Sequence, residues 1–268
     1  MDRARAIRAD DIVILSDRVD RVEVEQIARE FLALPAAVHV SVGDTFGRFR
    51  NARLSRLGTA PTICLTDTPL RPMQSLAKRA FDVAVASVAL VLLSPLLAAI
   101  AAAIHYDSPG KVLFRQRRRG FNQEEFRIWK FRTMTTTEDG DEVRQATAND
   151  VRITRVGAWL RRLNLDELPQ LVNVLRGEMS IVGPRPHAVS HDEHYEARIS
   201  AYPRRLNVKP GLTGWAQIHG FRGPTQTEAD MASRVDHDLY YIDNWSMLLD
   251  LYIIAMTVLS PKAYRNAM

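Results

Sequence analysis

The sequence predicts a mixed α/β protein whose middle part enters a membrane. Residues 1–70 alternate short apolar runs with a helix-like stretch, residues 81–104 are almost continuously apolar, and the remainder mixes apolar and basic segments. With 46% hydrophobic and 25% charged residues over a length of 268, the composition is that of a globular chain and excludes a disordered or collagen-like one. The single cysteine, Cys64, excludes a disulfide scaffold and a cysteine-rich zinc site, and favours a reducing, cytosol-facing context.

The net charge of +5 is unevenly distributed along the chain. Residues 1–75 carry +1, residues 76–135 carry +6 and residues 136–268 carry −2. Because the basic stretch surrounds the most apolar run, the pattern favours an anionic membrane surface or a phosphorylated ligand. Nucleic acid is the competing interpretation, but the aromatic-basic interleaving or helix-turn-helix pattern typical of such proteins is missing, so we expect no nucleic acid.

The N-terminal segment, residues 1–75, is expected to be separate from the rest. It contains three predicted strands and one predicted amphipathic helix: DIVIL (11–15), AVHVSV (37–42), TICLTD (62–67) and the helix EVEQIAREFLAL (23–34). This β-α-β pattern predicts a parallel sheet, and it lacks the glycine-rich fingerprint of a nucleotide site. Residues 71–80 are expected to form a linker.

The apolar run FDVAVASVALVLLSPLLAAIAAAI covers residues 81–104. A continuous helix of this length would be about 36 Å long, enough to cross a bilayer. Pro95, after Ser94, predicts a break, because an interior proline removes a backbone hydrogen bond. Both flanks are basic, which favours the cytoplasmic face for both ends: Lys78, Arg79, Lys111, Arg115, Arg117, Arg118 and Arg119. We therefore expect a re-entrant helix-break-helix; the alternative is a buried Ala/Leu-rich helix in the core of a soluble protein.

The C-terminal part is expected to be an α+β domain over residues 76–268. KVLFRQRRRGFNQEEFRIWKFRTM (111–134) predicts two short strands around Gly120, followed by a polar loop over residues 135–150. A helix is expected from Leu165 to Leu175, then a turn-rich segment over residues 177–186. Residues 238–259 predict one amphipathic helix, whose Tyr and Trp residues suit either a membrane interface or core packing.

The candidate chemistry centres on the adjacent acids Asp166 and Glu167. Alone, such a pair is usually solvated charge in the first turn of a helix. Several basic residues could join it: Lys130, Arg132, Arg161, Arg162 and Arg185, the last between Pro184 and Pro186. Since Arg suits bidentate phosphate contacts and carboxylates suit a metal, the combination favours transfer of a phosphorylated group.

His187 and His191 have the i,i+4 spacing of some zinc ligands. The HExxH pattern of metallopeptidases is absent, so a polar loop or a substrate contact is the favoured interpretation.

Five stretches together resemble one known family. KRAFDVAVASVALVLLSP, VLFRQRRRG, KFRTM, RITRVGAWLRRLNLDELPQLVNVLRGEMSIVGPRP and KPGLTGWAQIHG occur in unbroken order over residues 76–260. They resemble the bacterial sugar transferases, monotopic phosphoglycosyl transferases that move a sugar-1-phosphate from a UDP-sugar to undecaprenyl phosphate. Residues 183–195 and 221–246 are similar to the subgroup that begins exopolysaccharide or capsule synthesis with glucose-1-phosphate.

The resemblance implies roles for the residues already singled out. Asp166 matches the nucleophile that forms an aspartyl-phosphosugar and releases UMP, and Glu167 matches the acid that holds Mg²⁺. Lys130, Arg161 and Arg185 match positions proposed to contact phosphates. Ser94 and Pro95 match the break of the re-entrant helix. Residues 1–75 look like the tail of a Rossmann-like domain.

Other functions stay open at this point. The chain could be a non-catalytic basic scaffold on the membrane surface, or a relative specific for galactose or an N-acetylhexosamine. The resemblance implies UDP-glucose as donor, undecaprenyl phosphate as acceptor, membrane lipid as partner and the cytoplasmic face of the bacterial inner membrane as location. Homo-oligomerisation is left open.

Overall fold

The computed structural model describes residues 10–14, 26, 30–31, 34–41, 53–58, 60–66, 68–135, 150–223 and 227–260. The chain divides into two compact units, Met1–Arg71 and Pro72–Met268. The predicted helix over residues 23–34 and the predicted loop over residues 135–150 lie mostly outside the described residues.

The first unit contains a four-stranded sheet in the order β1-β2-β4-β3. The strands are β1 (Asp11–Ile14), β2 (Ala37–Ser41), β3 (Arg53–Leu57) and β4 (Ala60–Thr66), so the three predicted strands are confirmed and β3 was missed. β1 and β2 are parallel, as predicted, but β4 runs antiparallel to both β2 and β3. The expectation of a wholly parallel sheet is therefore wrong. Gly58, at φ 60°, lies between the paired residues Leu57 and Ala60, and this tight reversal makes β3 and β4 a hairpin.

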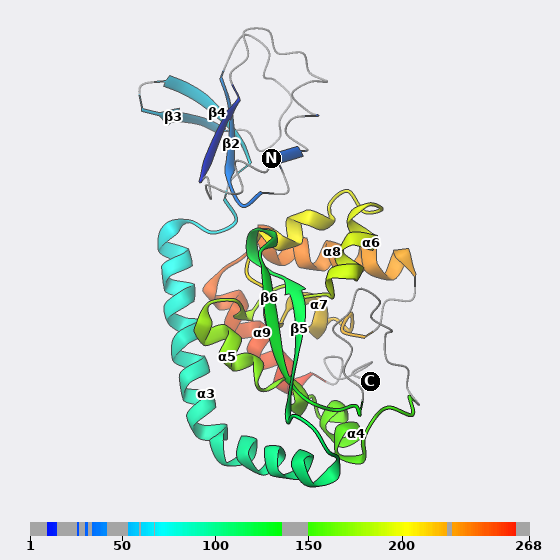
Figure 1. The fold of residues 1–268 in the computed structure, drawn as a ribbon. Coiled ribbons are helices and arrows are strands. Elements are labelled where there is room, and N and C mark those ends of the chain that lie inside the picture. The colour runs from blue at the N-terminus through cyan, green and yellow to red at the C-terminus, as the bar shows by residue number, and fades with distance from the viewer. Residues whose placement is uncertain are drawn as a thin grey trace. The chain divides into compact units, whose positions relative to one another are not determined.

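The second unit begins with one long helix, α3 (Pro72–Asp107), where a linker was predicted over residues 71–80. Pro72 suits the first helical position, since its missing N–H would be unpaired there anyway. The backbone stays helical through Ser94 and Pro95, so the expected break is instead a bend (Figure 1). An interior proline is a common cause of such a bend, and the Ser94 hydroxyl donates to the Val91 carbonyl oxygen at 2.8 Å.

Much of the apolar surface of α3 is exposed. Val91 and Leu92 are each 72% exposed, and α3 is the one helix in the described parts of the chain that is long and apolar enough to cross a membrane. A core helix of a soluble protein would bury such side chains. The structure thus favours membrane association over the core-helix alternative.

Both ends of α3 bind the remainder of the second unit. Near its start, the ammonium group of Lys78 lies 2.6 Å from Asp250, and Arg79 donates to the carbonyl oxygen of Leu175 at 2.7 Å. Near its end, Arg132 donates to the carbonyl oxygen of Ser108 at 2.6 Å, and Ile104 is buried in an apolar cluster. Lys78 and Arg79, expected at the membrane surface, are therefore engaged with protein groups.

The remaining elements combine a hairpin, a two-stranded parallel sheet and short helices. In chain order they are β5 (Leu113–Arg119), η1 (Phe121–Gln123), β6 (Glu125–Phe131), α4 (Arg155–Arg162), η2 (Leu165–Glu167), α5 (Gln170–Arg176), β7 (Ser180–Val182), α6 (Val189–Glu196), η3 (Tyr202–Asn207), β8 (Gly211–Thr213), α7 (Trp215–Ile218), α8 (Glu228–Asp243) and α9 (Met247–Leu259). β5 and β6 are the two strands predicted around Gly120, and they pair antiparallel, whereas β7 and β8 are parallel.

Two helix predictions need correction. The expected helix from Leu165 to Leu175 is a short 3₁₀ turn, η2, followed by α5. The expected single helix over residues 238–259 is the end of α8 followed by α9. Ser246 separates them, because its hydroxyl accepts from the Leu249 N–H and so begins a new helix.

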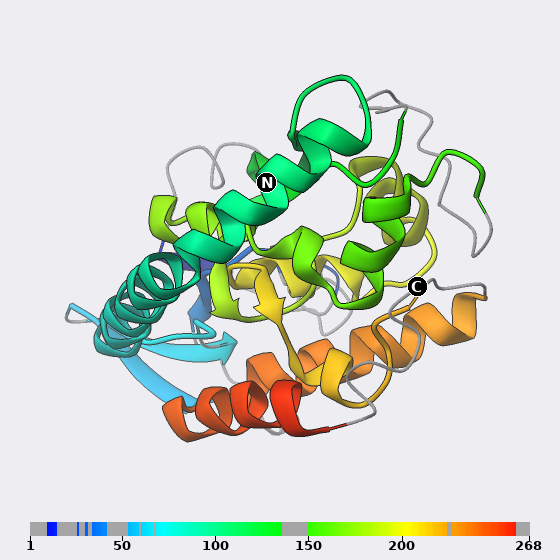
Figure 2. The same cartoon turned by 90° about the horizontal axis from the view of Figure 1, so that it is seen from below.

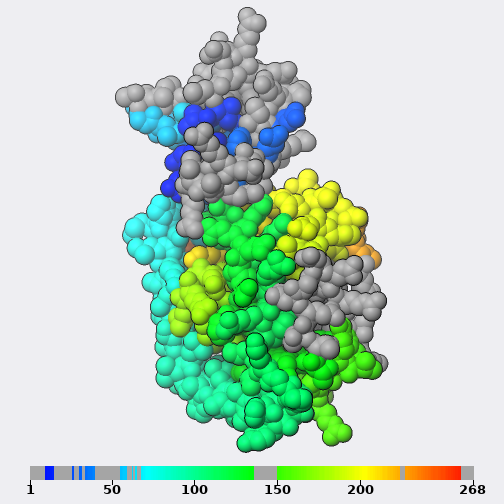
Figure 3. Space-filling view, in the orientation of Figure 1, coloured from blue at the N-terminus to red at the C-terminus, as the bar shows by residue number. Residues whose placement is uncertain are grey.

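The arrangement leaves the hairpin on one face of the second unit. Figure 3 shows the green surface of β5 and β6 there, with α3 along its edge. In Figure 2, which shows the molecule from below, the last part of α3 runs along one edge of the second unit. The orange and red helices α8 and α9 lie along the other edge. The segment that follows β7 carries Arg185 and meets β5 at an isolated bridge between Ala188 and Arg118.

Candidate active site

The acidic pair Asp166-Glu167 lies in η2, between α4 and α5. Asn164, just before it, has φ 57°, a left-handed conformation that Asn tolerates better than most residues. This residue changes the chain direction after α4, and Pro169, the N-cap of α5, follows the pair after Leu168. The local backbone therefore presents the two carboxylates on a short turn between two helices.

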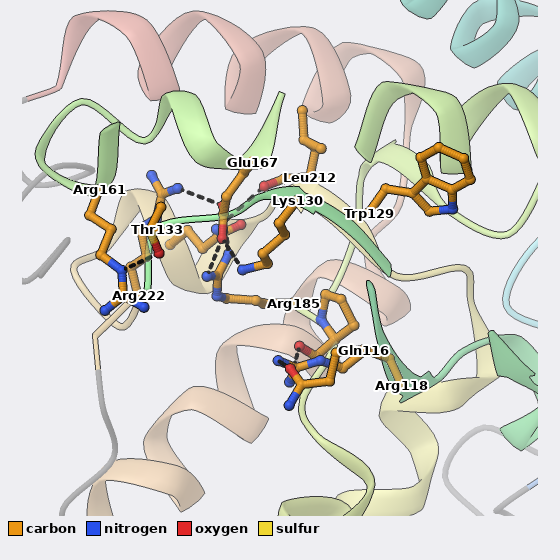
Figure 4. A network of polar contacts seen from close by, with 12 residues as sticks. Gln116, Arg118, Trp129, Lys130, Thr133, Arg161, Glu167, Arg185, Leu212 and Arg222 are labelled. Carbon is orange, nitrogen blue, oxygen red and sulfur yellow. Dashed lines mark hydrogen bonds and ion pairs between the residues drawn. The ribbon is translucent and has the colours of Figure 1, made fainter. Parts of the chain in front are cut away.

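Three basic side chains from separate segments surround the Glu167 carboxylate. Lys130 donates to Oε1 at 2.8 Å, and Arg185 donates to Oε1 at 2.7 Å and to Oε2 at 3.1 Å. Arg222 donates to Oε2 at 3.0 Å. Figure 4 shows these side chains converging on Glu167, and we call Lys130, Arg185 and Arg222 the cationic cluster.

The charges of this cluster control the ionisation of Glu167. Burial alone would raise the pKa of Glu167, but the charges of Arg185 and Lys130 hold it well below its usual range. Burial lowers the pKa of Lys130, while the charge of Glu167 opposes that change. Glu167 is thus an ionised carboxylate whose oxygens are both engaged.

Asp166 differs from its neighbour. It accepts no hydrogen bond from the described residues, and its pKa is raised, mainly by burial and secondly by the charge of Glu167. The charges of Lys130 and Arg161 oppose the rise. Asp166 therefore offers a carboxylate that is not occupied by another side chain and stands in a positive field.

Arg161 reaches this region from the last turn of α4. Its Nε donates to the Thr133 hydroxyl at 2.9 Å, and its Nη2 lies 3.2 Å from the sulfur of Met134. Gly157 allows this approach, since a Cβ there would collide with the backbone of Thr133. Packing of α4 against the end of the hairpin thus places Arg161 beside the acidic pair.

The structure brings three of the predicted basic residues to the acidic pair and adds one that sequence reasoning missed. Lys130, Arg161 and Arg185 all act electrostatically on Asp166. Arg222 was not predicted. It lies two residues after the stretch KPGLTGWAQIHG, and this proximity to a family motif could have identified it as a candidate. Arg132 lies elsewhere, at the end of α3, and Arg162 is exposed.

A magnesium ion can be tested against these residues. Among the described residues, no three His, Cys, Asp or Glu side chains gather as metal ligands. Mg²⁺, however, commonly binds through one or two carboxylates together with substrate phosphates. Asp166, whose carboxylate accepts no hydrogen bond from the described residues, and its neighbour Glu167 could supply these carboxylate ligands. For Glu167 to do so, one of its cationic partners must give way to the ion.

Comparisons with known proteins agree with this chemistry. The family model described as "Bacterial sugar transferase" matches residues 73–261. Three relatives are each named UDP-glucose:undecaprenyl-phosphate glucose-1-phosphate transferase. The one from Escherichia coli K12 is 44% identical over 96% of this chain and 56% of its own length. Those from Xanthomonas campestris and Caulobacter vibrioides are 52% and 46% identical, over 92% and 84% of this chain and 52% and 85% of their own lengths. The chain spans about half the length of the first two.

Proposed function

We propose a function from one premise: the chain belongs to the bacterial sugar transferase family. In this proposal it transfers glucose-1-phosphate from UDP-glucose to undecaprenyl phosphate, the reaction that the names of its relatives state for them. The other product would be UMP. The reaction would be the first membrane step of exopolysaccharide synthesis.

The observation that carries the proposal is the contrast within the acidic pair. Glu167 is saturated by three cations, whereas Asp166 has no hydrogen-bond partner among the described residues. A carboxylate that is free to attack, beside basic groups in excess of the acids, suits displacement at a diphosphate. A scaffold that only binds anionic lipid would not need an acidic pair held among these cations.

The proposed chemistry has two displacements. An oxygen of Asp166 attacks the β-phosphorus of UDP-glucose, and the bond from that phosphorus to the bridging oxygen breaks. UMP leaves with the electron pair, and Asp166 becomes an acyl phosphate, the mixed anhydride of its carboxyl group with glucose phosphate. An oxygen of undecaprenyl phosphate then attacks the same phosphorus, which releases the Asp166 carboxylate and forms the diphosphate-linked lipid.

The cationic cluster and Arg161 would bind the diphosphate of the UDP-glucose donor. Lys130, Arg185 and Arg222 already hold an anionic oxygen pair, that of Glu167, and a phosphate presents similar acceptors. Glu167 is the residue proposed to hold Mg²⁺ once the diphosphate takes over some of its cationic partners. When bound, that ion offsets negative charge on the diphosphate.

We propose that α3 is re-entrant, with both ends on the cytoplasmic face of the inner membrane. Its first turns bind α5 and α9, and its last turns bind Arg132 and the apolar cluster with Phe131, so both ends join the same compact unit. A crossing helix would place its ends on opposite sides of the bilayer. The bend at Pro95 is compatible with a return to the entry face.

Cysteine labelling tests this topology. Lys78 is unsuitable because it is buried in its ion pair, so the cysteines belong at Met73, which is 76% exposed, and at Lys111. In a Cys64→Ser background, a reagent that cannot cross the membrane should label both positions only from the cytoplasmic side. Labelling of either one from the periplasm would show a crossing helix instead.

The activity is tested by incubating the whole protein with Mg²⁺ and UDP-glucose without lipid acceptor. Intact-protein mass spectrometry should show one added hexose phosphate, on Asp166, with release of UMP. Asp166→Asn keeps the size of the side chain but removes the anion, so the adduct and turnover should both vanish. If, with undecaprenyl phosphate added, the variant released UMP at the wild-type rate and formed no adduct, direct attack by the lipid phosphate would be the better mechanism.

The donor sugar is tested in the same assay. We propose UDP-glucose, and faster UMP release from UDP-galactose or a UDP-N-acetylhexosamine would change that assignment. No UMP release from any of these donors, with lipid binding intact, would favour the non-catalytic scaffold.

A further inference from the structure

Behind the cationic cluster lies a buried polar network that the proposed chemistry does not use. At its centre is His187, which is 7% exposed and lies two residues after Arg185. Tyr202, Arg205 and Arg234 surround its ring, and all three are buried. We call these four residues the histidine network. It joins segments that are widely separated in the chain, η3 and α8 among them.

Two arginines of the network bind the backbone beside two arginines of the cationic cluster. Arg205 donates through Nη2 to the carbonyl oxygen of Arg185 at 2.9 Å. Arg234 donates through Nη2 to the carbonyl oxygen of Gly223, the residue directly after Arg222. The position of a side chain depends on the position of its backbone. By fixing the backbone at Arg185 and next to Arg222, these two hydrogen bonds help to hold both side chains in place beside Glu167.

His187 contacts both of these supporting arginines. The Nη1 atom of Arg234 lies 3.1 Å from Nε2 of His187, and the Nη1 atom of Arg205 lies 3.0 Å from Nδ1. The Tyr202 hydroxyl lies 2.7 Å from the same Nδ1. One imidazole ring therefore contacts both Arg205, which binds the backbone of Arg185, and Arg234, which binds the backbone next to Arg222.

The hydrogen-bond inventory selects a tautomer. The Tyr202 hydroxyl donates to Asp192 at 2.7 Å, so its oxygen is left to accept from a proton on Nδ1 of His187. Nε2 can then accept from Arg234, as a neutral imidazole has one donor and one acceptor. We assign the proton to Nδ1 on this basis. With the proton on Nδ1, Arg205, which can only donate, makes no hydrogen bond to the ring. It is anchored by Asp238 at 2.7 Å and packs over the ring of Tyr202, so His187 supports Arg205 through Tyr202.

The electrostatic environment keeps this ring neutral. Burial, followed by the charges of Arg205 and Arg234, lowers the pKa of His187 well below its ordinary value. A protonated ring could not accept from Arg234.

We propose that His187 is a positioning residue that couples Arg185 to Arg222, so that both guanidiniums meet the donor diphosphate in one arrangement. This inference rests on the proposed function, which assigns Arg185 and Arg222 to the UDP-glucose donor. A residue needed only for stability would affect both substrates alike, whereas a coupling residue affects one of them. Loss of the coupling should weaken the donor interaction and leave the acceptor interaction unchanged.

Steady-state kinetics of the whole protein with UDP-glucose and undecaprenyl phosphate provide the test. His187→Phe keeps a ring of similar size but removes both nitrogen contacts. We expect KM for UDP-glucose to rise about tenfold, the effect of one lost hydrogen bond to a charged group, with KM for the acceptor unchanged. His187→Gln, which retains a donor and an acceptor, should recover part of the donor affinity. His191→Phe, the same change on a half-buried histidine of α6, should behave as wild type.

The outcomes separate three cases. A folded His187→Phe protein with wild-type KM for UDP-glucose would overturn the coupling, and so would a fall in kcat with both KM values unchanged. If His187→Phe does not fold, Tyr202→Phe decides by the same criterion, since it removes the acceptor of the Nδ1 proton. Absence of UMP release from the wild-type protein would overturn the proposed function itself, and is recognised before any variant is compared.

Discussion

Two buried carboxylates of the second unit, Glu167 and Asp250, are each paired with a lysine, and they differ in what else surrounds them. Asp250, in the first turn of α9, receives Lys78 at 2.6 Å, the Tyr241 hydroxyl at 2.8 Å and the indole N–H of Trp245 at 3.2 Å. One cation and two neutral donors thus satisfy one anion. Glu167 instead receives three cations.

The difference separates a structural ion pair from a binding site. Around Asp250 the charges of the pair cancel, and its bonds tie the start of α3 to α8 and α9 with no group left over for a ligand. Around Glu167 and Asp166 the basic groups exceed the acids: Lys130, Arg161, Arg185 and Arg222 face two carboxylates. Such an excess costs free energy unless an anion arrives, which is what a diphosphate substrate would supply.

The largest expected effect is on stability, from Asp250→Asn. This change leaves the Lys78 ammonium buried without its counter-ion, which typically costs about 3–5 kcal/mol. Denaturant unfolding should show that loss, while UMP release per folded molecule stays near the wild-type value. Asp243→Asn is the matched control: its ion pair with Arg204 is exposed, so its loss should cost only about 0–1 kcal/mol. A cost for Asp250→Asn as small as that of the control would contradict the structural assignment.

The next effect is on activity, from Glu167→Gln. Turnover should fall by about 10²–10³, a common cost of removing a charge-organising group from a site. The variant should also lose stability, because the cationic cluster is left without an anion, and inorganic pyrophosphate should restore it by binding there. Pyrophosphate should not rescue Asp250→Asn. Equal rescue of both variants would remove the distinction between the two regions.

The smallest expected effect is on pH dependence, from Lys130→Met. Burial and the charge of Glu167 raise the pKa of Asp166, and the charge of Lys130 lowers it. Since the ionised form attacks, activity is lost as the pH falls through this pKa, and removing Lys130 should move the acid limb of kcat/KM to higher pH. Lys111→Met, an exposed lysine outside the cluster, should leave the limb in place. An unmoved limb in Lys130→Met would show that Asp166 does not sense the cluster.

Features that depend on neighbouring residues could be predicted from the sequence. The strands on both sides of Gly120, the apolar run of α3 and the adjacency of Asp166 and Glu167 follow from patterns only a few residues long. The predictions that were wrong concern how secondary-structure elements are connected and oriented relative to one another. The direction of β4, the helical path through Pro95 and the break between α8 and α9 depend on partners outside the local pattern.

The family, the membrane-associated helix and the acidic pair could be identified from the residues alone, because these are properties of contiguous residues and of motif order. Which cation meets which carboxylate depends instead on how the chain folds. Lys78 and Asp250 are 172 residues apart and Arg222 is 55 residues from Glu167, separations over which no periodicity carries information. A basic residue on the flank of an apolar run looks the same in sequence whether it faces lipid or a buried aspartate. The ion pair with Asp250 of α9 gives Lys78 a structural role, and convergence of three segments on η2 makes Arg222 part of the candidate site.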